Sequence, residues 1–351
     1  MCEVHNVHLI GSVALPDTGT VFKTLAGELG PWLKRIPDGE TGNRGRWIYW
    51  QREMLLEHPD FEVASDIPEM ELTEWNGRVF RKVPYIRLKP GVYPRNVTIV
   101  PGYADAALDS YKTFKEMRDA GSIPAGVKFQ VCLPTAMSSA YQFIAPSSIP
   151  AFLDIYEGAL LGELKRIVEA IPHADLSIQW DICQEVLIYE NYKPYAHRPD
   201  NYKQQIADEL VRLGDAVPAD VDMGYHLCYG SPADAHLVMP KDMAIMVEMT
   251  DSFISRAGRR VNFLHMPVPQ DRADEAYFAP LKSLKLPQET EFYLGLIHHG
   301  DADGDKARLQ EACKVVGRFG VATECGWGRT DPARVPGLVS AHRRIMEAQG
   351  A

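Results

Sequence analysis

The sequence predicts an α/β protein built as a (β/α)8 barrel, the fold also called a TIM barrel. Eight short apolar runs recur along the 351-residue chain, separated by polar or Gly/Pro-rich segments and amphipathic stretches. This alternation is typical of βαβ units whose strands form a parallel sheet. A barrel of eight such units takes about 250 residues, so the chain is long enough for one barrel and roughly 100 further residues.

The expected strands are the eight apolar runs. In chain order they are Val7–Gly11, Leu33–Ile36, Val127–Leu133, Leu176–Trp180, Val221–Tyr225, Val261–Leu264, Phe292–Ile297 and Gly320–Ala322. Helices with apolar residues three and four positions apart are expected at Ile149–Ile171, Asn201–Leu213, Lys241–Arg256, Lys306–Phe319 and Pro336–Gln349. An open doubly wound sheet is the alternative fold, but the G-x-G-x-x-G fingerprint of a dinucleotide site follows none of the runs.

The additional residues are expected between the second and third strands, at about 42–126. This region holds a Trp-rich segment, Gly45–Met54, and two strand-like runs, Val83–Lys89 and Asn96–Val100. We interpret it as a cap inserted over the barrel mouth, within a single domain that spans residues 1–351. A separate small domain is the alternative.

Composition excludes several classes of partner. Lys and Arg number 37 against 47 Asp and Glu, a formal net charge of −10, which gives no electrostatic footprint for nucleic acid or an anionic membrane. No apolar stretch approaches the roughly 20 residues of a membrane helix, and the first residues do not resemble a signal peptide. Six scattered cysteines do not form a disulfide framework. We therefore expect a cytoplasmic protein with reduced cysteines.

Residues with functional chemistry follow nearly every expected strand. In a barrel of this kind the site is built from the carboxyl ends of the strands. The segments found there are Gly11–Ser12, Asp38–Glu40, Pro134–Thr135, Asp181, His226–Cys228, His265, His298–His299 and Glu324–Gly326. A scaffold shaped only by stability would place few titratable groups at one rim.

The sharpest group among them is the H-x-C of His226 and Cys228, together with Cys325. Side chains at i and i+2 of a strand end point to the same side, and closing a barrel brings distant strand ends to one rim. Two thiolates and an imidazole suit Zn²⁺. The alternative is a buried Cys and a hydrogen-bonded His without a metal, the role expected for the other cysteines, Cys2, Cys132, Cys183 and Cys313.

The segments LIGSVALPD, PDGETGNR, IQWD, YHLCYG and TECGWGR together resemble the catalytic domain of cobalamin-independent methionine synthase. That domain belongs to a wider group of zinc barrels that includes the epoxyalkane:coenzyme M transferases. The residues that match the family motifs are Gly11, Ser12 and Pro16 for G-S-x-P, Asp38, Gly39, Glu40 and Arg44 for D-G-E-x-x-R, Ile178, Gln179 and Asp181 for I-Q-x-D, His226 and Cys228 for H-x-C, and Cys325 and Gly326 for C-G.

The resemblance implies a role for each of these residues. His226, Cys228 and Cys325 would bind zinc, and His265 would either replace the family's Glu ligand or leave the fourth position open. Asp181 would hold the amine of a thiol substrate in a pocket also lined by Ser12, Asp38 and Glu40. His298 or His299 would act in acid/base catalysis, although this pair could equally bond to loop carbonyls. The family's I-D-E-P is replaced by Asp181–Gln184, without the second acid or the proline.

The function this implies is a zinc-dependent methyl or alkyl transferase that holds a thiol such as homocysteine as a zinc-bound thiolate. The donor would be methylfolate, a methylcorrinoid or another alkyl compound. Three alternatives remain: an epoxide:thiol transferase of the coenzyme M type, a metal-free lyase of the uroporphyrinogen decarboxylase branch, and a non-catalytic barrel that binds zinc or a thiol metabolite. The sequence does not indicate an oligomeric state.

Overall fold

The computed structural model describes residues 2–230 and 236–349, and its centre is an eight-stranded parallel sheet. The strands of this sheet are β1 (Glu3–Val7), β2 (Arg35–Pro37), β7 (Lys128–Pro134), β8 (Leu176–Ile182), β9 (Asp222–Leu227), β10 (Phe263–Pro267), β11 (Glu291–Ile297) and β12 (Arg318–Thr323). Their order is β1-β12-β11-β10-β9-β8-β7-β2. Single parallel bridges, Val7 to Leu33 and Ser12 to Gly39, link the segments around β1 and β2 and bring the sheet round on itself. The predicted α/β barrel-like fold is confirmed.

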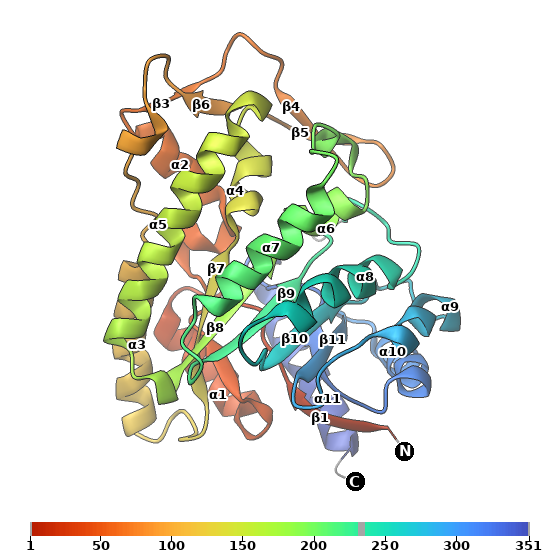
Figure 1. Ribbon diagram of the computed structural model, residues 1–351. Helices are drawn as coiled ribbons and strands as arrows, with labels where there is room; N and C mark the ends of the chain where they lie inside the picture. Colours follow the sequence, from red (N-terminus) through yellow and green to blue (C-terminus); the bar gives the residue numbers. More distant parts are fainter. Residues whose placement is uncertain (1, 231–235, 350–351) are drawn as a thin grey trace.

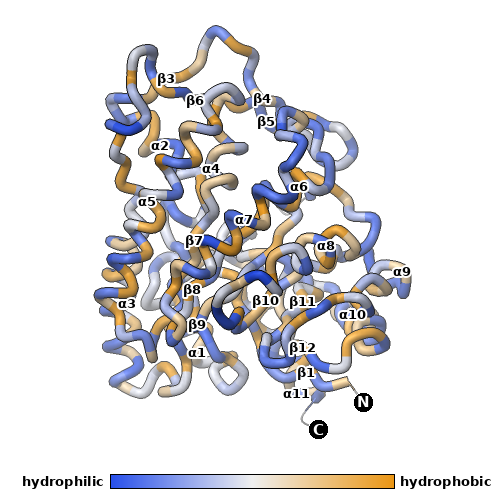
Figure 2. The backbone as a smooth tube through the Cα atoms, in the orientation of Figure 1, coloured by the Kyte–Doolittle hydropathy of each residue, from blue (hydrophilic) through white to orange (hydrophobic). Residues whose placement is uncertain are grey.

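Helices flank this sheet on its outer side (Figure 1). The longer ones are α1 (Thr18–Leu29), α3 (Tyr103–Asp119), α5 (Ile149–Ala170), α7 (Tyr202–Asp215), α8 (Ala244–Phe253), α10 (Ala302–Val315) and α11 (Val335–Gln349), and the short ones include α4 (Ala136–Phe143), α6 (Gln184–Tyr189) and α9 (Glu275–Phe278). Helix α5 buries Phe152, Leu160 and Ile167 on one face, which is the stripe that its sequence periodicity predicts. Hydrophobic and hydrophilic residues accordingly alternate along these helices in Figure 2.

Two expected elements are displaced from their predicted positions. The first strand is Glu3–Val7 rather than Val7–Gly11, because Glu3 and Val4 pair with Arg318 and Phe319 of β12. The apolar residues that follow leave the ladder and run toward the carboxyl ends of the strands, where Ser12 bridges to Gly39. The helix expected at Lys306–Phe319 ends at Val315, because β12 already begins at Arg318.

Between β2 and β7 the chain forms helix α2 (Tyr49–Glu57), two small antiparallel sheets and then helix α3. Strand β3 (Phe61–Val63) pairs with β6 (Ile86–Leu88), and β4 (Met70–Thr73) pairs with β5 (Val79–Val83). These strands lie at the end of the molecule opposite the two chain termini (Figure 1). The strand expected at Asn96–Val100 does not form, since residues 97–100 have no regular structure.

Arg35 forms a cluster of ion pairs at the amino-terminal end of the barrel. Its buried guanidinium donates to Asp222 Oδ2 and Glu291 Oε2, both at 2.8 Å, and lies 4.2 Å from the centre of the Phe263 ring. Arg35, Asp222, Phe263 and Glu291 are the first residues of β2, β9, β10 and β11. Burial by itself raises the pKa of Glu291, but Arg35 and Lys34 outweigh it and lower that pKa to about 2.

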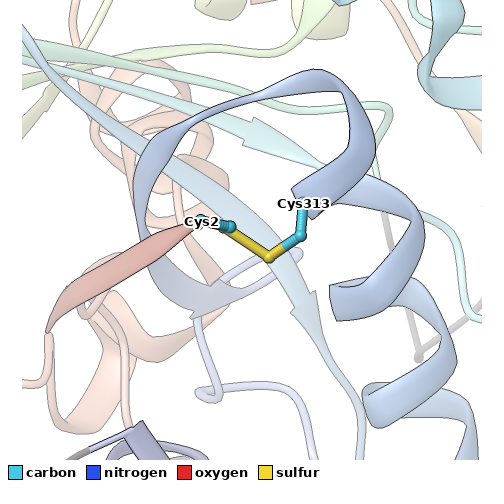
Figure 3. Close-up of a disulfide and its surroundings, with 2 residues drawn as sticks. All are labelled: Cys2 and Cys313. Carbon is cyan, nitrogen blue, oxygen red and sulfur yellow. A yellow bond between two sulfur atoms is a disulfide. The ribbon is translucent and has the colours of Figure 1, made fainter.

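The Cys2–Cys313 disulfide joins the segment before β1 to helix α10 (Figure 3). The two Cα atoms are 5.2 Å apart and the residues are separated by 311 positions in the sequence. The prediction that the cysteines are all reduced is therefore wrong for this pair, while Cys132, Cys183, Cys228 and Cys325 are free. Folding brings the amino-terminal residues beside α10, a proximity that cysteine spacing does not reveal.

Among the helices that the structure describes, none combines the length and the apolar character needed to span a bilayer. The cytoplasmic location stays a prediction.

We expect Arg35→Met to lower the free energy of unfolding at pH 7 by about 3–5 kcal/mol, because it removes the buried cation that pairs with two partly buried carboxylates. Glu291 has a folded-state pKa of about 2 against an ordinary value of 4.5, so its contribution is complete above pH 4.5 and is lost as the pH falls toward 2. Urea unfolding at pH 7 and pH 3 should show the difference from wild type shrinking at the lower pH. The control is Lys34→Met, whose half-exposed ion pair with Glu291 should contribute less than about 1 kcal/mol.

Thiol titration of the protein, denatured without reductant, should detect the four free cysteines, and titration after reduction should detect two more. Cys313→Ser should leave Cys2 as a free thiol. This variant should therefore show one thiol more than wild type before reduction, and no further thiol after reduction. Six thiols before reduction would contradict the disulfide.

Candidate metal centre and pocket

Three of the predicted ligands meet at the carboxyl ends of the strands. His226 lies at the end of β9, Cys228 directly follows this strand, and Cys325 follows β12. One ligand atom of each residue lies within 4.8 Å of those of the other two, and the two Sγ atoms are 3.7 Å apart. The spacing of the H-x-C motif places its two side chains on the same side of β9 and toward Cys325.

This donor set fits zinc. Two thiolates at roughly 2.3 Å from a tetrahedral zinc ion would have their sulfur atoms about 3.8 Å apart, and the observed separation is 3.7 Å. Without a cation the neighbouring Cys228 and burial raise the pKa of Cys325 to about 12, so the two thiols do not both ionise. His226 and Cys228 are buried, and Cys325 is partly buried. Three protein ligands would leave one coordination position for another group.

The structure does not bring His265 into this group. Its Nδ1 lies 2.7 Å from Nδ1 of His226, and its Nε2 lies 3.1 Å from the carbonyl oxygen of Thr323. Both ring nitrogens are therefore engaged by protein atoms. Burial and the neighbouring His226 hold the pKa of His265 well below its ordinary value, so the ring is neutral.

The three ligands border a cavity of about 90 Å³ at the barrel mouth. Its wall comes from strand ends, through residues such as Ser12, Glu40 and Asp181, and from the segment between β2 and β7. The residues from that segment are Arg46, Trp47, Tyr49, Leu72 and Phe80. Aromatic and apolar side chains from that segment and polar groups from the strand ends therefore line the cavity together.

Two carboxyl groups, those of Glu40 and Asp181, lie in this cavity. Burial raises the pKa of Asp181 to about 8, although hydrogen bonds from Gln179 and Trp47 oppose the shift. Burial, followed by repulsion from Asp181, raises the pKa of Glu40 well above its usual range. A neighbouring pair of carboxyl groups with raised pKa values is a site for a cation or a shared proton.

Asp38 differs from Glu40 although the two lie in one turn. Its carboxylate accepts from the Arg44 guanidinium at 2.7 Å, the Ser110 hydroxyl at 2.7 Å and the backbone N–H of Glu40 at 2.8 Å. Gly39 and Glu40 both have positive φ, 82° and 46°, and this turns the Glu40 side chain into the cavity. Asp38 therefore holds the turn, while Glu40 faces the site.

Ser12 lines the cavity and also connects two strand ends. Its carbonyl oxygen accepts from Trp327 N–H at 2.6 Å, and its hydroxyl accepts from Gly328 N–H at 3.2 Å. These bonds fix the loop that carries Cys325 against the segment after β1.

The two expected acid/base residues lie beside a different groove. Within the part of the chain that the structure describes, His298 and His299 border a groove of about 730 Å³ that Cys325 also borders. His298 is held by Val268, with Nε2 2.9 Å from its carbonyl oxygen, and its Nδ1 lies 3.7 Å from Glu324 Oε2. His299 is exposed and lies against Gly337 of α11.

Sequence reasoning missed Arg329. This partly buried side chain donates from Nη2 to Cys325 Sγ at 2.9 Å and also lines the cavity. Arg329 follows Cys325 by four residues in the TECGWGR segment, so a search for cations near the predicted ligands would have found it. It places a permanent positive charge beside the two sulfur atoms.

No protein-family model matches the chain, and no curated protein matches it. Two solved structures are similar to it over nearly its whole length. A candidate vitamin-B12-independent methionine synthase from Listeria monocytogenes aligns with a TM-score of 0.56 and 12% identity, covering 99% of this chain and 98% of its own. A B12-independent methionine synthase from Shewanella sp. W3-18-1, in complex with selenomethionine, aligns with a TM-score of 0.55 and 14% identity over the same shares. At such identities the likeness establishes a common fold, and both structures carry the name of the family that the sequence motifs resemble.

The contrast between Glu40 and Asp38 can be tested by stability. Glu40→Gln should leave the free energy of unfolding equal to or above that of wild type. The pKa of Glu40 is raised in the folded state, so this carboxyl group makes the wild-type protein less stable as the pH rises above 4.5, the ordinary pKa of a glutamate. The difference in the free energy of unfolding between Glu40→Gln and wild type should therefore grow from pH 5 to pH 8. Asp38→Asn should lower stability by about 1–3 kcal/mol, because it weakens hydrogen bonds to a charged acceptor. Urea unfolding at both pH values measures this; equal losses in the two variants would contradict the assignment.

Proposed function

We propose that this protein is a zinc-dependent methyl or alkyl transferase of the methionine synthase type, with a thiol as its acceptor substrate. The observation that carries the proposal is the convergence of His226, Cys228 and Cys325 within 4.8 Å, on the wall of a cavity that two carboxyl groups, those of Glu40 and Asp181, also line. Such a set has the chemistry of a catalytic zinc site with an open position. When bound, zinc would keep the sulfur of a substrate thiol ionised at neutral pH.

The residues around the cavity support a small thiol with an amino group, such as homocysteine. An ammonium beside Glu40 and Asp181 would favour their ionised forms and offset the cost of burying them. Gln179, which donates to Asp181 Oδ1 at 2.8 Å, holds one of these carboxyl groups in place. In this proposal the amine is bound here and the sulfur points to the three ligands.

We assign the segment between β2 and β7 the role of a cap. Leu72 and Phe80 from its small strands, with Trp47 and Tyr49, line the cavity. They would exclude water from the sulfur and strengthen the electrostatic interactions around it. The adjacent groove of about 730 Å³ is large enough for a methylfolate donor. His298, held at that groove by Val268, is the better placed of the two histidines to give a proton to the leaving atom of the donor.

The purified protein should contain close to one zinc per chain by metal analysis, and Cys325→Ser should lose it. Cys132→Ser is the matched control: its sulfur bonds to the Ile10 carbonyl at 3.1 Å, a bond that a serine hydroxyl can also make, so zinc should be retained. Zinc X-ray absorption should gain a sulfur ligand on addition of homocysteine, and incubation with methylfolate or a methylcorrinoid should then yield methionine.

Other outcomes would identify the alternatives. A folded protein that binds no zinc would contradict the proposal and point to the metal-free lyase. Zinc without an added sulfur ligand across a panel of thiols would leave a barrel that binds metal without this reaction. Consumption of an epoxide by a thiol, with no methyl transfer from either donor, would indicate the coenzyme M type of reaction.

A further inference from the structure

We propose that His265 is a positioning residue that sets the orientation and tautomer of His226, and is not itself a metal ligand. The inference rests on the proposed zinc function, because it concerns how the ligand His226 is presented. Its basis is a chain of contacts from the Thr323 carbonyl through the His265 ring to the His226 ring. Groups that bond to a ligating histidine in this way fix its ring and its tautomer.

The first link sets the proton on His265. A carbonyl oxygen only accepts hydrogen bonds, so the 3.1 Å contact between Thr323 O and His265 Nε2 requires the proton on Nε2. In a neutral imidazole the other nitrogen is then an acceptor. Nδ1 of His265 therefore offers a lone pair.

The second link passes this preference to His226. The two Nδ1 atoms are 2.7 Å apart, which is a hydrogen bond with one proton between them. Since His265 accepts at this atom, the proton belongs to Nδ1 of His226. A neutral His226 then has an unprotonated Nε2, and this is the nitrogen left to bind a metal beside Cys228 and Cys325.

The backbone is arranged to permit the relay. His226 and His265 are register partners on the adjacent parallel strands β9 and β10, so both side chains lie on the same side of the sheet, and both are buried. A Cβ atom at Gly295 of β11 would lie 2.7 Å from His265 Nε2 and 2.6 Å from Thr323 O. Only glycine at that position leaves room for the bond between the ring and the carbonyl.

The relay also connects the two halves of the ligand set. Thr323 is the last residue of β12, and its hydroxyl donates to the carbonyl of Cys325 at 2.8 Å. The Trp327 indole in turn donates to that hydroxyl at 2.7 Å. The strand end that carries Cys325 therefore also holds the acceptor that orients His226.

The test compares His265→Asn with His265→Leu. These side chains have nearly the same size, but only Asn keeps an acceptor near the position of Nδ1. Zinc affinity is measured by competition with a chromophoric chelator, with circular dichroism to confirm folding. The Leu variant should bind zinc roughly 10–100-fold more weakly than wild type, the usual effect of removing such a partner, and the Asn variant should recover most of the loss.

Two further measurements keep the test decisive. Nitrogen NMR of the histidine-labelled, metal-free wild type should place the proton on Nδ1 of His226 and on Nε2 of His265. Gly295→Ala alters neither histidine but crowds the contact between His265 and Thr323, so it should weaken zinc binding as Leu does. If the Leu variant does not fold, the NMR assignment and Gly295→Ala decide.

Three results would overturn the proposal. The first is a His265→Leu variant that binds zinc with wild-type affinity, and the second is a proton on Nε2 of His226. The third is an equal loss of zinc affinity in His265→Asn and His265→Leu, together with loss of a nitrogen ligand in zinc X-ray absorption. This third result would make His265 a ligand. A wild-type protein that binds no zinc at all would instead contradict the proposed function, and the NMR assignment would still report whether the relay exists.

Discussion

The candidate site depends on one constraint, the closure of the parallel sheet between β1 and β2. Single bridges at Val7–Leu33 and Ser12–Gly39 complete the circle, and the carboxyl ends of the parallel strands then share one rim. Cys228 and Cys325 are 97 positions apart in the sequence, yet closure places their sulfur atoms at 3.7 Å. An open sheet with the same strands would not bring them together.

The pKa values of acidic side chains are shifted in opposite directions at the two ends of the barrel. At the amino-terminal end, Arg35 is matched by two carboxylates, and the pKa of Glu291 falls to about 2. At the carboxyl end, burial raises the pKa of Asp181 to about 8, and Glu40 is raised with it. Matched charge stabilises the fold, whereas carboxyl groups held in an unfavourable state are what a cationic ligand can relieve. The ion pairs of Arg35 at the amino-terminal end therefore stabilise the fold, while the buried carboxyl groups at the carboxyl end destabilise it.

Much of this could be predicted from the sequence, and the remainder has physical reasons. Apolar runs located the strands, and the rule that sites lie at strand ends brought His226, Cys228 and Cys325 forward as a group. The separate roles of Asp38 and Glu40 could not be predicted, because they depend on positive φ angles at Gly39 and Glu40. His265 was expected as a ligand, but a glycine on the neighbouring strand lets its ring reach the Thr323 carbonyl instead. The Cys2–Cys313 disulfide depends on a contact between the ends of the chain.

The segment between β2 and β7 lines the cavity that holds Asp181 and Glu40. Burial is the largest cause of the raised pKa values of Asp181 and Glu40. Leu72 and Phe80 lie on this segment and line the same cavity as the two carboxyl groups. If the segment moved away, water would reach both carboxyl groups, and their pKa values would fall toward the ordinary range. The affinity of the pocket for a proton or an ammonium would therefore depend on the position of a segment that contributes none of the three candidate ligands, His226, Cys228 and Cys325.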